Sequence, residues 1–169
     1  YKNFYMSKKE QGGGALRDES HGIDLVRYII GEVDKVSAMI DNTSRLQMTS
    51  DDAAFLTFKM KNGALIQINF DLSSRFPRIN LEIVGSDGTI IWDRVENILK
   101  IFTIKSKKWK IIKFTKKDLL KMYPNQAKHF YNCIYNKHKS LIDIQDAIYT
   151  QKIIDAAFLA NAKQKTIKI

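Results

Sequence analysis

The sequence predicts an α+β domain in which an open, mainly antiparallel β-sheet carries its helices on one face. Alternating polar and apolar residues fill the middle of the chain, short turn signals separate these stretches, and helical patterns lie on both sides of them. With 169 residues, 44% of them hydrophobic, the chain can fill one core but is too short for two comfortable domains. We therefore expect residues 1–169 to form a single domain.

The first part of the chain predicts a lead-in, a helix and a strand. Residues 1–11 are polar and aromatic without a clear period, which indicates an extended segment. Gly12-Gly13-Gly14 then opens a helix that runs to about Ile30, where Gly31 supplies a left-handed stop. A first strand is predicted at 33–41 and a polar loop at 42–50.

The middle of the chain predicts an antiparallel meander. A strand at 54–60 places alternate apolar residues on one face, and Asn62-Gly63 follows as the strongest short hairpin signal, because both turn positions need positive φ. The return strand alternates in the same way from Ile66 to Leu72. Turn residues then separate four further predicted strands, at 79–83, 89–93, 98–104 and 108–114.

The end of the chain predicts two helices, at 125–137 and 144–162, and a tail at 166–169 that can add an edge strand. The single cysteine, Cys133, lies in the first of these helices beside Phe130 and Ile134, so we expect a buried structural thiol. One cysteine rules out an internal disulfide and fits a reducing cytoplasm, which is the location that we expect.

The net charge of +10 comes mostly from lysine, and the densest cluster lies between Lys105 and Lys117. Its lysines are interleaved with Trp109, Ile111 and Phe114, which is typical of a two-stranded ribbon with one solvated face. We therefore interpret the cluster as solvated surface first and as attraction to an anionic substrate second, and we expect no nucleic-acid partner. No membrane partner is expected either, because no apolar run approaches the ~20 residues of a membrane span.

A polar stripe on the first predicted helix is the candidate site. Arg17, His21, Asp24 and Tyr28 stand at i, i+4, i+7 and i+11, and Asp18 lies about 60° from His21. An imidazole beside carboxylates and a guanidinium can exchange a proton near neutral pH. A solvated helix face is the other interpretation of the same spacing, and the spacing alone leaves both open.

The three glycines before this helix do not form a dinucleotide fingerprint, because no buried strand precedes them and Arg17 stands where a third glycine is needed. Glycine does let a backbone approach a ligand or a neighbouring domain closely. His21 and Asp24 could offer two metal ligands, but no third histidine or cysteine has a suitable spacing, so we expect no metal.

Several motifs together resemble one known family. The glycine run, the Asp-x-Ser-His-x-x-Asp helix and the Gly31-Glu32-Val33 corner are followed by further matching segments: Asp51-Asp52-Ala53, Lys61-Asn62-Gly63, and Gly85-Ser86-Asp87-Gly88-Thr89-Ile90 leading into Trp92-Asp93. In this order the chain resembles the Gfo/Idh/MocA family, which includes glucose–fructose oxidoreductase and inositol dehydrogenase. The resemblance covers essentially the whole chain and is weakest from Arg94 to Lys117.

The resemblance implies the C-terminal substrate-binding and dimerisation domain of an NAD(P)-dependent oxidoreductase, which acts on a hydroxyl or carbonyl of a sugar or sugar derivative. A nucleotide-linked sugar is one candidate. A separate N-terminal Rossmann domain, expected upstream of Tyr1, would bind NAD or NADP, so this chain alone is expected to bind neither. A homodimer through the open sheet face is also implied, and a non-catalytic dimerisation or partner-binding module is the alternative.

The resemblance also assigns roles to residues. His21 matches the family's catalytic histidine, but the family's usual acid lies one turn earlier, where this sequence has Arg17, so Asp18 is the substitute that the resemblance implies. Gly13 and Gly14 are expected at the periphery of the cofactor site. The expected substrate contacts are Arg17, Asp24 and the lead-in residues Tyr5, Lys8 and Lys9.

Overall fold

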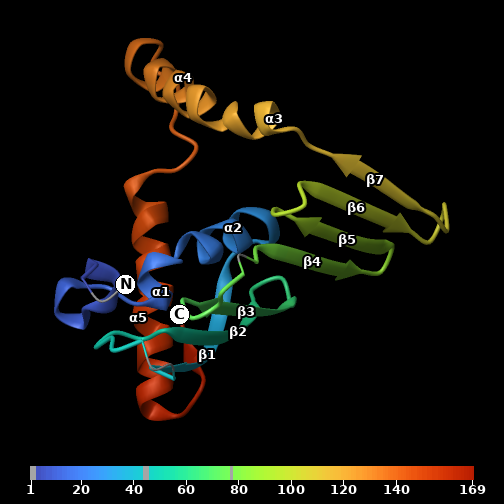
Figure 1. Ribbon diagram of the computed structural model, residues 1–169. Helices are drawn as coiled ribbons and strands as arrows, with labels where there is room; N and C mark the ends of the chain where they lie inside the picture. Colours follow the sequence, from blue (N-terminus) through green and yellow to red (C-terminus); the bar gives the residue numbers. More distant parts are fainter. Residues whose placement is uncertain (1–2, 44–45, 77) are drawn as a thin grey trace. The chain divides into compact units, whose positions relative to one another are not determined.

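The computed structural model describes residues 3–43, 46–76 and 78–169. The chain divides into two compact units, and Figure 1 shows their elements. Unit 1 comprises Tyr1–Ser74 and Ile142–Ile169, and unit 2 comprises Arg75–Leu141. Each unit has its own sheet, and the expectation that residues 1–169 form a single domain stays a prediction.

Unit 1 contains an antiparallel sheet with the strand order β3-β2-β1-β8. Its strands are β1 (Val33–Asp41), β2 (Ala53–Met60), β3 (Leu65–Asp71) and β8 (Ile167–Lys168). Directly paired residues share a face, so Val36 with Phe58 and Ile40 with Ala54 stand on one side of the sheet. That side is buried, whereas the opposite side exposes Met39 and its partner Phe55.

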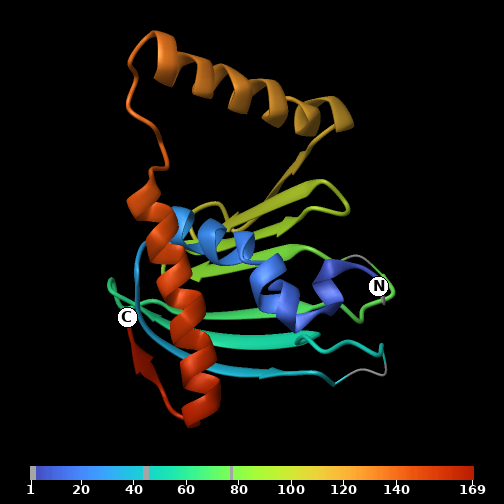
Figure 2. The same cartoon turned by 90° about the vertical axis from the view of Figure 1, so that its left-hand side faces the viewer.

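Helices cover only the buried side of this sheet (Figure 2). They are α1 (Ala15–Asp18), α2 (His21–Ile30) and α5 (Ile144–Lys163), and two 3₁₀ turns, η1 (Tyr5–Ser7) and η2 (Lys9–Gln11), precede them. Leu16 and Ile23 pack with Ile153 and the sheet residues Leu56 and Phe58 in one core. Such burial of apolar surface is the main stabilising contribution to a fold of this size.

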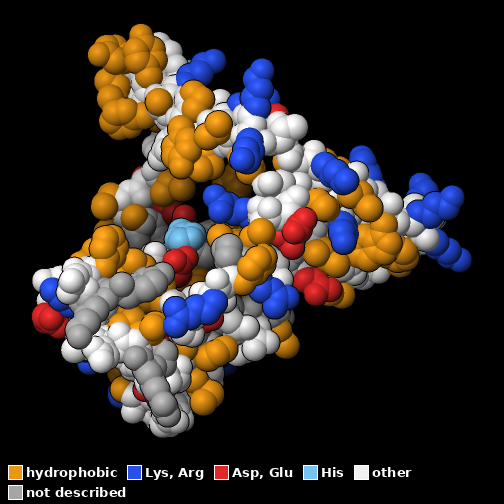
Figure 3. Space-filling model, in the orientation of Figure 1, with side chains coloured by type: hydrophobic (Ala, Val, Ile, Leu, Met, Phe, Trp, Pro, Cys, Tyr) orange, Lys and Arg blue, Asp and Glu red, His pale blue; other side chains and the backbone are white. Residues whose placement is uncertain are grey.

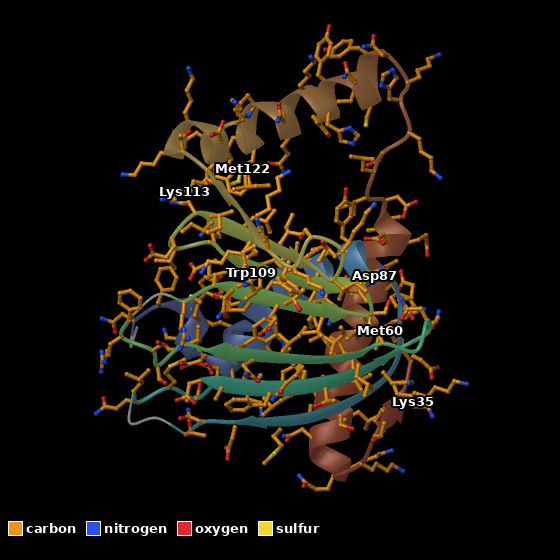
Figure 4. The ribbon with its side chains drawn as sticks, turned by 90° about the vertical axis from the view of Figure 1, so that its right-hand side faces the viewer. Lys35, Met60, Asp87, Trp109, Lys113 and Met122 are labelled. Carbon is orange, nitrogen blue, oxygen red and sulfur yellow. The ribbon has the colours of Figure 1, made fainter. Side chains whose placement is uncertain are left out.

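Unit 2 contains a second antiparallel sheet, in the order β4-β5-β6-β7, and two helices. None of its described residues belongs to the buried core. Figure 4 shows side chains standing on both faces of the strands, with Trp109 and Lys113 at the two ends of β7. The elements are β4 (Asn80–Gly85), β5 (Gly88–Asp93), β6 (Ile98–Thr103), β7 (Trp109–Lys113), α3 (Lys116–Leu120) and α4 (Met122–Tyr135).

The α+β class and the antiparallel strands are confirmed, and every predicted strand exists within two residues of its expected bounds. Four details differ from the prediction. The predicted meander is split into two sheets after β3, the lead-in forms two 3₁₀ turns rather than an extended segment, and Cys133 is half-buried rather than fully buried. The predicted first helix is also broken, between Asp18 and His21.

The break has a local cause in the backbone hydrogen bonds. Ser20 N donates to Arg17 O and Gly22 N donates to Glu19 O, both over three residues, whereas a continuous α-helix bonds over four. The turn between α1 and α2 is therefore tighter than an α-helix. The predicted polar stripe assumed a continuous helix with 3.6 residues per turn. Because the tight turn interrupts that helix, Arg17 and His21 do not lie on one straight stripe.

Candidate active site around His21

Two residues of the glycine run, Gly13 and Gly14, are packed against the chain itself. A Cβ atom at Gly13 would collide with the backbone oxygens of Tyr5 and Met6, and one at Gly14 would collide with the Asp51 carboxylate. Gly14 also has φ of 134°, which residues with a side chain rarely adopt. Internal packing therefore explains both glycines, while their predicted position at the edge of a cofactor site stays a prediction.

Asp51 holds the start of α1. Its backbone oxygen accepts from Ala15 N at 2.9 Å, and its carboxylate oxygen Oδ2 accepts from Leu16 N at 2.9 Å. These bonds satisfy two amides at the beginning of a helix, which have no partner inside the helix. The loop before β2 thus fixes the helix that leads to the candidate site.

The lead-in segment is tied to the same loop. Ser50 Oγ donates to Met6 O at 2.6 Å, Thr49 N donates to Ser7 O at 2.9 Å, and Lys9 N donates to Thr49 Oγ1 at 3.0 Å. The predicted substrate contacts Tyr5, Lys8 and Lys9 therefore lie on an anchored segment.

Tyr5 and Asp18, both predicted from the sequence, come together. The Asp18 carboxylate accepts a hydrogen bond from the Tyr5 phenol, and this bond, with the negative charge of Asp18, raises the pKa of Tyr5. Asp18 Oδ2 also accepts from Gly14 N at 3.0 Å. The half-buried Asp18 carboxylate is thus fixed between the lead-in and the start of α1.

His21 is the first residue of α2, and its side chain is 72% exposed. Its Nε2 atom lies 3.2 Å from Glu19 Oε2, so the carboxylate next to the imidazole is Glu19. Figure 3 shows a histidine at the surface over α1 and α2, with acidic side chains beside it. Sequence reasoning missed Glu19 because a residue two positions away lies on another side of a regular helix, and only the tight turn brings it to His21.

Arg17 lies against α5 rather than beside His21. Its guanidinium carbon is 4.5 Å from the centre of the Phe158 ring, which is a cation–π contact. The residue is exposed.

Asp24 belongs to a network centred on Arg27, whose side chain is only 4% exposed. Asp24 Oδ1 accepts from Thr150 Oγ1 at 3.0 Å and from Arg27 Nη1 at 3.4 Å. Arg27 Nη2 also donates to Glu32 Oε1 at 2.9 Å and Asp146 Oδ1 at 2.8 Å. Burial opposes the charge of Arg27, but its hydrogen bonds to Glu32 and Asp146 and their negative charges outweigh burial and raise the pKa of Arg27. The network joins the middle of α2 to the start of α5.

The site therefore consists of two close pairs, Tyr5 with Asp18 and His21 with Glu19, at the break between α1 and α2. Arg17 and Asp24 have other partners, on α5 and around Arg27. In the described part of the chain, no group of three or more histidine, cysteine, aspartate or glutamate residues could hold a metal ion. An exposed imidazole with a carboxylate beside it can accept or donate a proton, which is the chemistry that this arrangement offers.

Comparisons with known proteins agree with this fold. The family described as "Oxidoreductase family, C-terminal alpha/beta domain" matches residues 2–169. A curated relative, 2,7-anhydro-N-acetylneuraminate hydratase from Escherichia coli K12, is 27% identical over 96 residues, which is 54% of this chain and 26% of that protein.

Solved structures with the same fold include two sugar-related enzymes. Levoglucosan dehydrogenase in complex with NADH and levoglucosan has a TM-score of 0.84 and 19% identity, over 98% of this chain and 53% of that one. The WlbA dehydrogenase from Bordetella pertussis, in complex with NADH and UDP-GlcNAcA, has a TM-score of 0.73 and 19% identity, over 93% of this chain and 46% of that one. The chain thus spans about half the length of these structures.

Proposed function

The chain belongs to the Gfo/Idh/MocA oxidoreductase family, as a C-terminal α/β domain of that family, and from this premise we propose that it is the substrate-binding and proton-transfer half of an NAD(P)-dependent enzyme. The substrate is a sugar or sugar derivative with a hydroxyl or carbonyl group that the enzyme oxidises or reduces. A Rossmann domain elsewhere in the whole protein holds NAD or NADP. The expected cytoplasmic location belongs to the same proposal.

The observation that carries the proposal is the setting of His21. An exposed imidazole at the first residue of α2, 3.2 Å from the Glu19 carboxylate, is accessible to a ligand and has an acceptor that can orient it. His21 takes the proton of the substrate hydroxyl during oxidation and returns it during reduction. The nicotinamide, when bound, supplies the exchange of hydride with the substrate carbon.

The packing of Gly13 and Gly14 supports the proposal that the cofactor binds elsewhere. These two glycines are packed against Tyr5, Met6 and Asp51 of the same chain, which leaves little room for a pyrophosphate at their backbone. We therefore assign Gly13 and Gly14 at most to the edge of the cofactor site, and we expect the chain alone to bind no NAD.

The remaining site residues have supporting roles. The single O–H of Tyr5 donates to Asp18, so the phenol oxygen is left to accept a hydrogen bond from a sugar hydroxyl. Asp24 is bonded to Arg27 and Thr150, which favours a role in positioning α2 over direct contact with substrate. The basic residues that could meet an anionic group of the substrate, such as a diphosphate, are Arg17, Lys8 and Lys9.

A sugar is favoured because the similar proteins named above carry sugar-related names or ligands, levoglucosan and UDP-GlcNAcA among them. A homodimer is proposed through the outer face of β1–β3, where Met39 and Leu65 are 75% and 74% exposed. Exposed apolar side chains on an uncovered sheet face favour pairing with a second copy of the protein. A monomer by light scattering of the whole protein would contradict the dimer.

The experiment is a matched pair of histidine substitutions in the whole protein. We expect His21→Gln to lower kcat by roughly 10²–10⁴-fold with a sugar substrate, because the proton acceptor is lost, and to leave the melting temperature unchanged, because the side chain is exposed. The control is His138→Gln, an exposed histidine in unit 2, which should keep wild-type kcat. NAD(P)H absorbance, measured over a panel of sugars and sugar nucleotides with both cofactors, gives the rates.

Retention of wild-type turnover by His21→Gln contradicts the catalytic role of His21. No turnover of any sugar by the wild type, with binding of a protein partner instead, would favour the non-catalytic module. The panel also identifies the substrate and the preferred cofactor.

A further inference from the structure

The net positive charge of the protein comes entirely from unit 2. That unit contains 15 of the 28 lysines and arginines but only 5 of the 18 acidic residues, so its net charge is +10 and unit 1 is neutral. A chain that was simply rich in lysine would carry the excess in both units. The densest part runs from Asn97 to Lys121, with nine lysines and Asp118 as its one acidic residue.

We name the surface formed by β6, β7, the turn between them and α3 the basic hairpin surface. Phe102 pairs with Trp109 and Lys100 with Ile111, so these side chains share one face. The rings of Phe102 and Trp109 are 5.5 Å apart, and Trp109 and Ile111 are 47% and 55% exposed. Figure 3 shows lysine and arginine side chains gathered along these elements with hydrophobic side chains between them.

The lysines project from a fixed scaffold. Lys107 N donates to Thr103 O at 2.9 Å and Ser106 Oγ lies 2.9 Å from Thr103 Oγ1, which close the turn between the strands. Asp118 is bonded to Thr115 and Lys121. Among the described residues, the other eight lysines of this segment have no acidic partner within ion-pair distance.

We propose that the basic hairpin surface docks on the anionic headgroups of a phospholipid bilayer, with Trp109 and Ile111 entering the boundary between headgroups and acyl chains. Lysines beside an exposed tryptophan and aliphatic side chains are what such a boundary accommodates. We expected no membrane partner, because the sequence has no apolar run long enough to span a bilayer. None of the described helices is long and apolar enough to cross a bilayer, and a peripheral contact does not require one.

Two other partners, a nucleic acid and a second copy of the chain, fit the basic hairpin surface less well. The segment has nine lysines and no arginine, whereas nucleic-acid recognition favours the planar, bidentate guanidinium. A second copy would bring two units of charge +10 together.

The test is flotation of the whole protein with vesicles of phosphatidylcholine alone or with about a third of phosphatidylglycerol, at about 0.1 M salt. We expect binding to the anionic vesicles only and its loss at ~1 M salt. Each lysine near the surface contributes about fivefold, so Lys105→Gln, Lys108→Gln and Lys113→Gln together should weaken binding on the order of a hundredfold. The control removes three exposed lysines of unit 1, at Lys152, Lys163 and Lys165, and should bind as the wild type does.

Tryptophan fluorescence tests the insertion separately. The wild type should show a blue shift on anionic vesicles, and Trp109→Phe should abolish it while Trp92 remains as the other tryptophan. No binding to anionic vesicles, equal binding to neutral ones, or equal weakening by the unit 1 variant overturns the proposal. Binding of single-stranded DNA with the same lysine dependence, without vesicle binding, also overturns it and assigns the surface to nucleic acid.

Discussion

Unit 1 and unit 2 each contain a four-stranded antiparallel sheet, but they bury very different amounts of side chain. In unit 1 the helices α1, α2 and α5 pack on one face of the sheet and enclose Leu56 and Phe58 completely. In unit 2 none of the described residues is enclosed in this way, and Ile83 and Leu99 are only half-buried. Strand formation thus needs only alternation and turns, while a core needs a second layer.

The two units also differ in net charge and in where their charged side chains lie. Unit 1 is neutral overall and places Arg27 inside, among three carboxylates. Unit 2 has a large excess of lysine and leaves it at the surface. We therefore expect single substitutions to disturb folding in unit 1 and association with partners in unit 2.

The largest effect on stability is expected for Arg27→Met. Methionine keeps the apolar stem but leaves Asp24, Glu32 and Asp146 without their shared cation, so the free energy of unfolding should fall by about 3–5 kcal/mol. Urea denaturation of the whole protein, followed by circular dichroism of the helices, measures the change.

The matched control for Arg27→Met is Arg94→Met, an exposed arginine of unit 2, which should change the free energy of unfolding by less than about 0.5 kcal/mol. Equal effects of the two substitutions would show that the network around Arg27 does not stabilise unit 1.

A smaller effect on stability is expected when one leucine of each sheet is truncated to alanine. Leu56→Ala removes a side chain that is 1% exposed and leaves a cavity in the core, so it should cost about 3 kcal/mol. Leu99→Ala changes a half-buried side chain in β6 and should cost about 1 kcal/mol, because water already reaches it. Urea denaturation of both variants gives the ratio, and a cost for Leu99→Ala as large as that for Leu56→Ala would reveal a core in unit 2 that forms in the whole protein.

The strands of both units could be predicted because their signals are local. Alternation from Ala54 to Met60 and the Asn62-Gly63 turn depend only on neighbouring residues. The hairpin between β2 and β3 is found, although of the two turn residues Gly63 alone has positive φ. The split into two sheets could not be predicted, since nothing between Leu72 and Ile79 distinguishes a turn within one sheet from a passage to another.

The candidate site was partly predictable for the same reason. His21 and Asp18 stand in a recognisable motif, and the contact between Tyr5 and Asp18 joins two residues that were both expected near the site. The pairing of His21 with Glu19 depends on the tight turn after Arg17, which no propensity indicates. The role of Asp24 depends on Thr150, more than a hundred residues away in the sequence, and such a contact is set by packing.

The smallest expected effect is a local one, at α3 in unit 2. Hydrogen bonds from Lys121 and from Thr115 hold the pKa of Asp118 well below its usual range. A carboxyl whose pKa is lowered by folding stabilises the folded form above its unfolded value of about 3.9, and this contribution is lost as pH falls towards the folded pKa. NMR chemical shifts of residues 116–120 should therefore report loss of helix below about pH 3.9, while Leu56 in the core of unit 1 stays protected from amide exchange. Asp118→Asn should remove this pH dependence, because the residue can no longer ionise. Simultaneous loss of α3 and of the unit 1 core on acidification would instead mean that the two units unfold as one, and the comparison between them would fail.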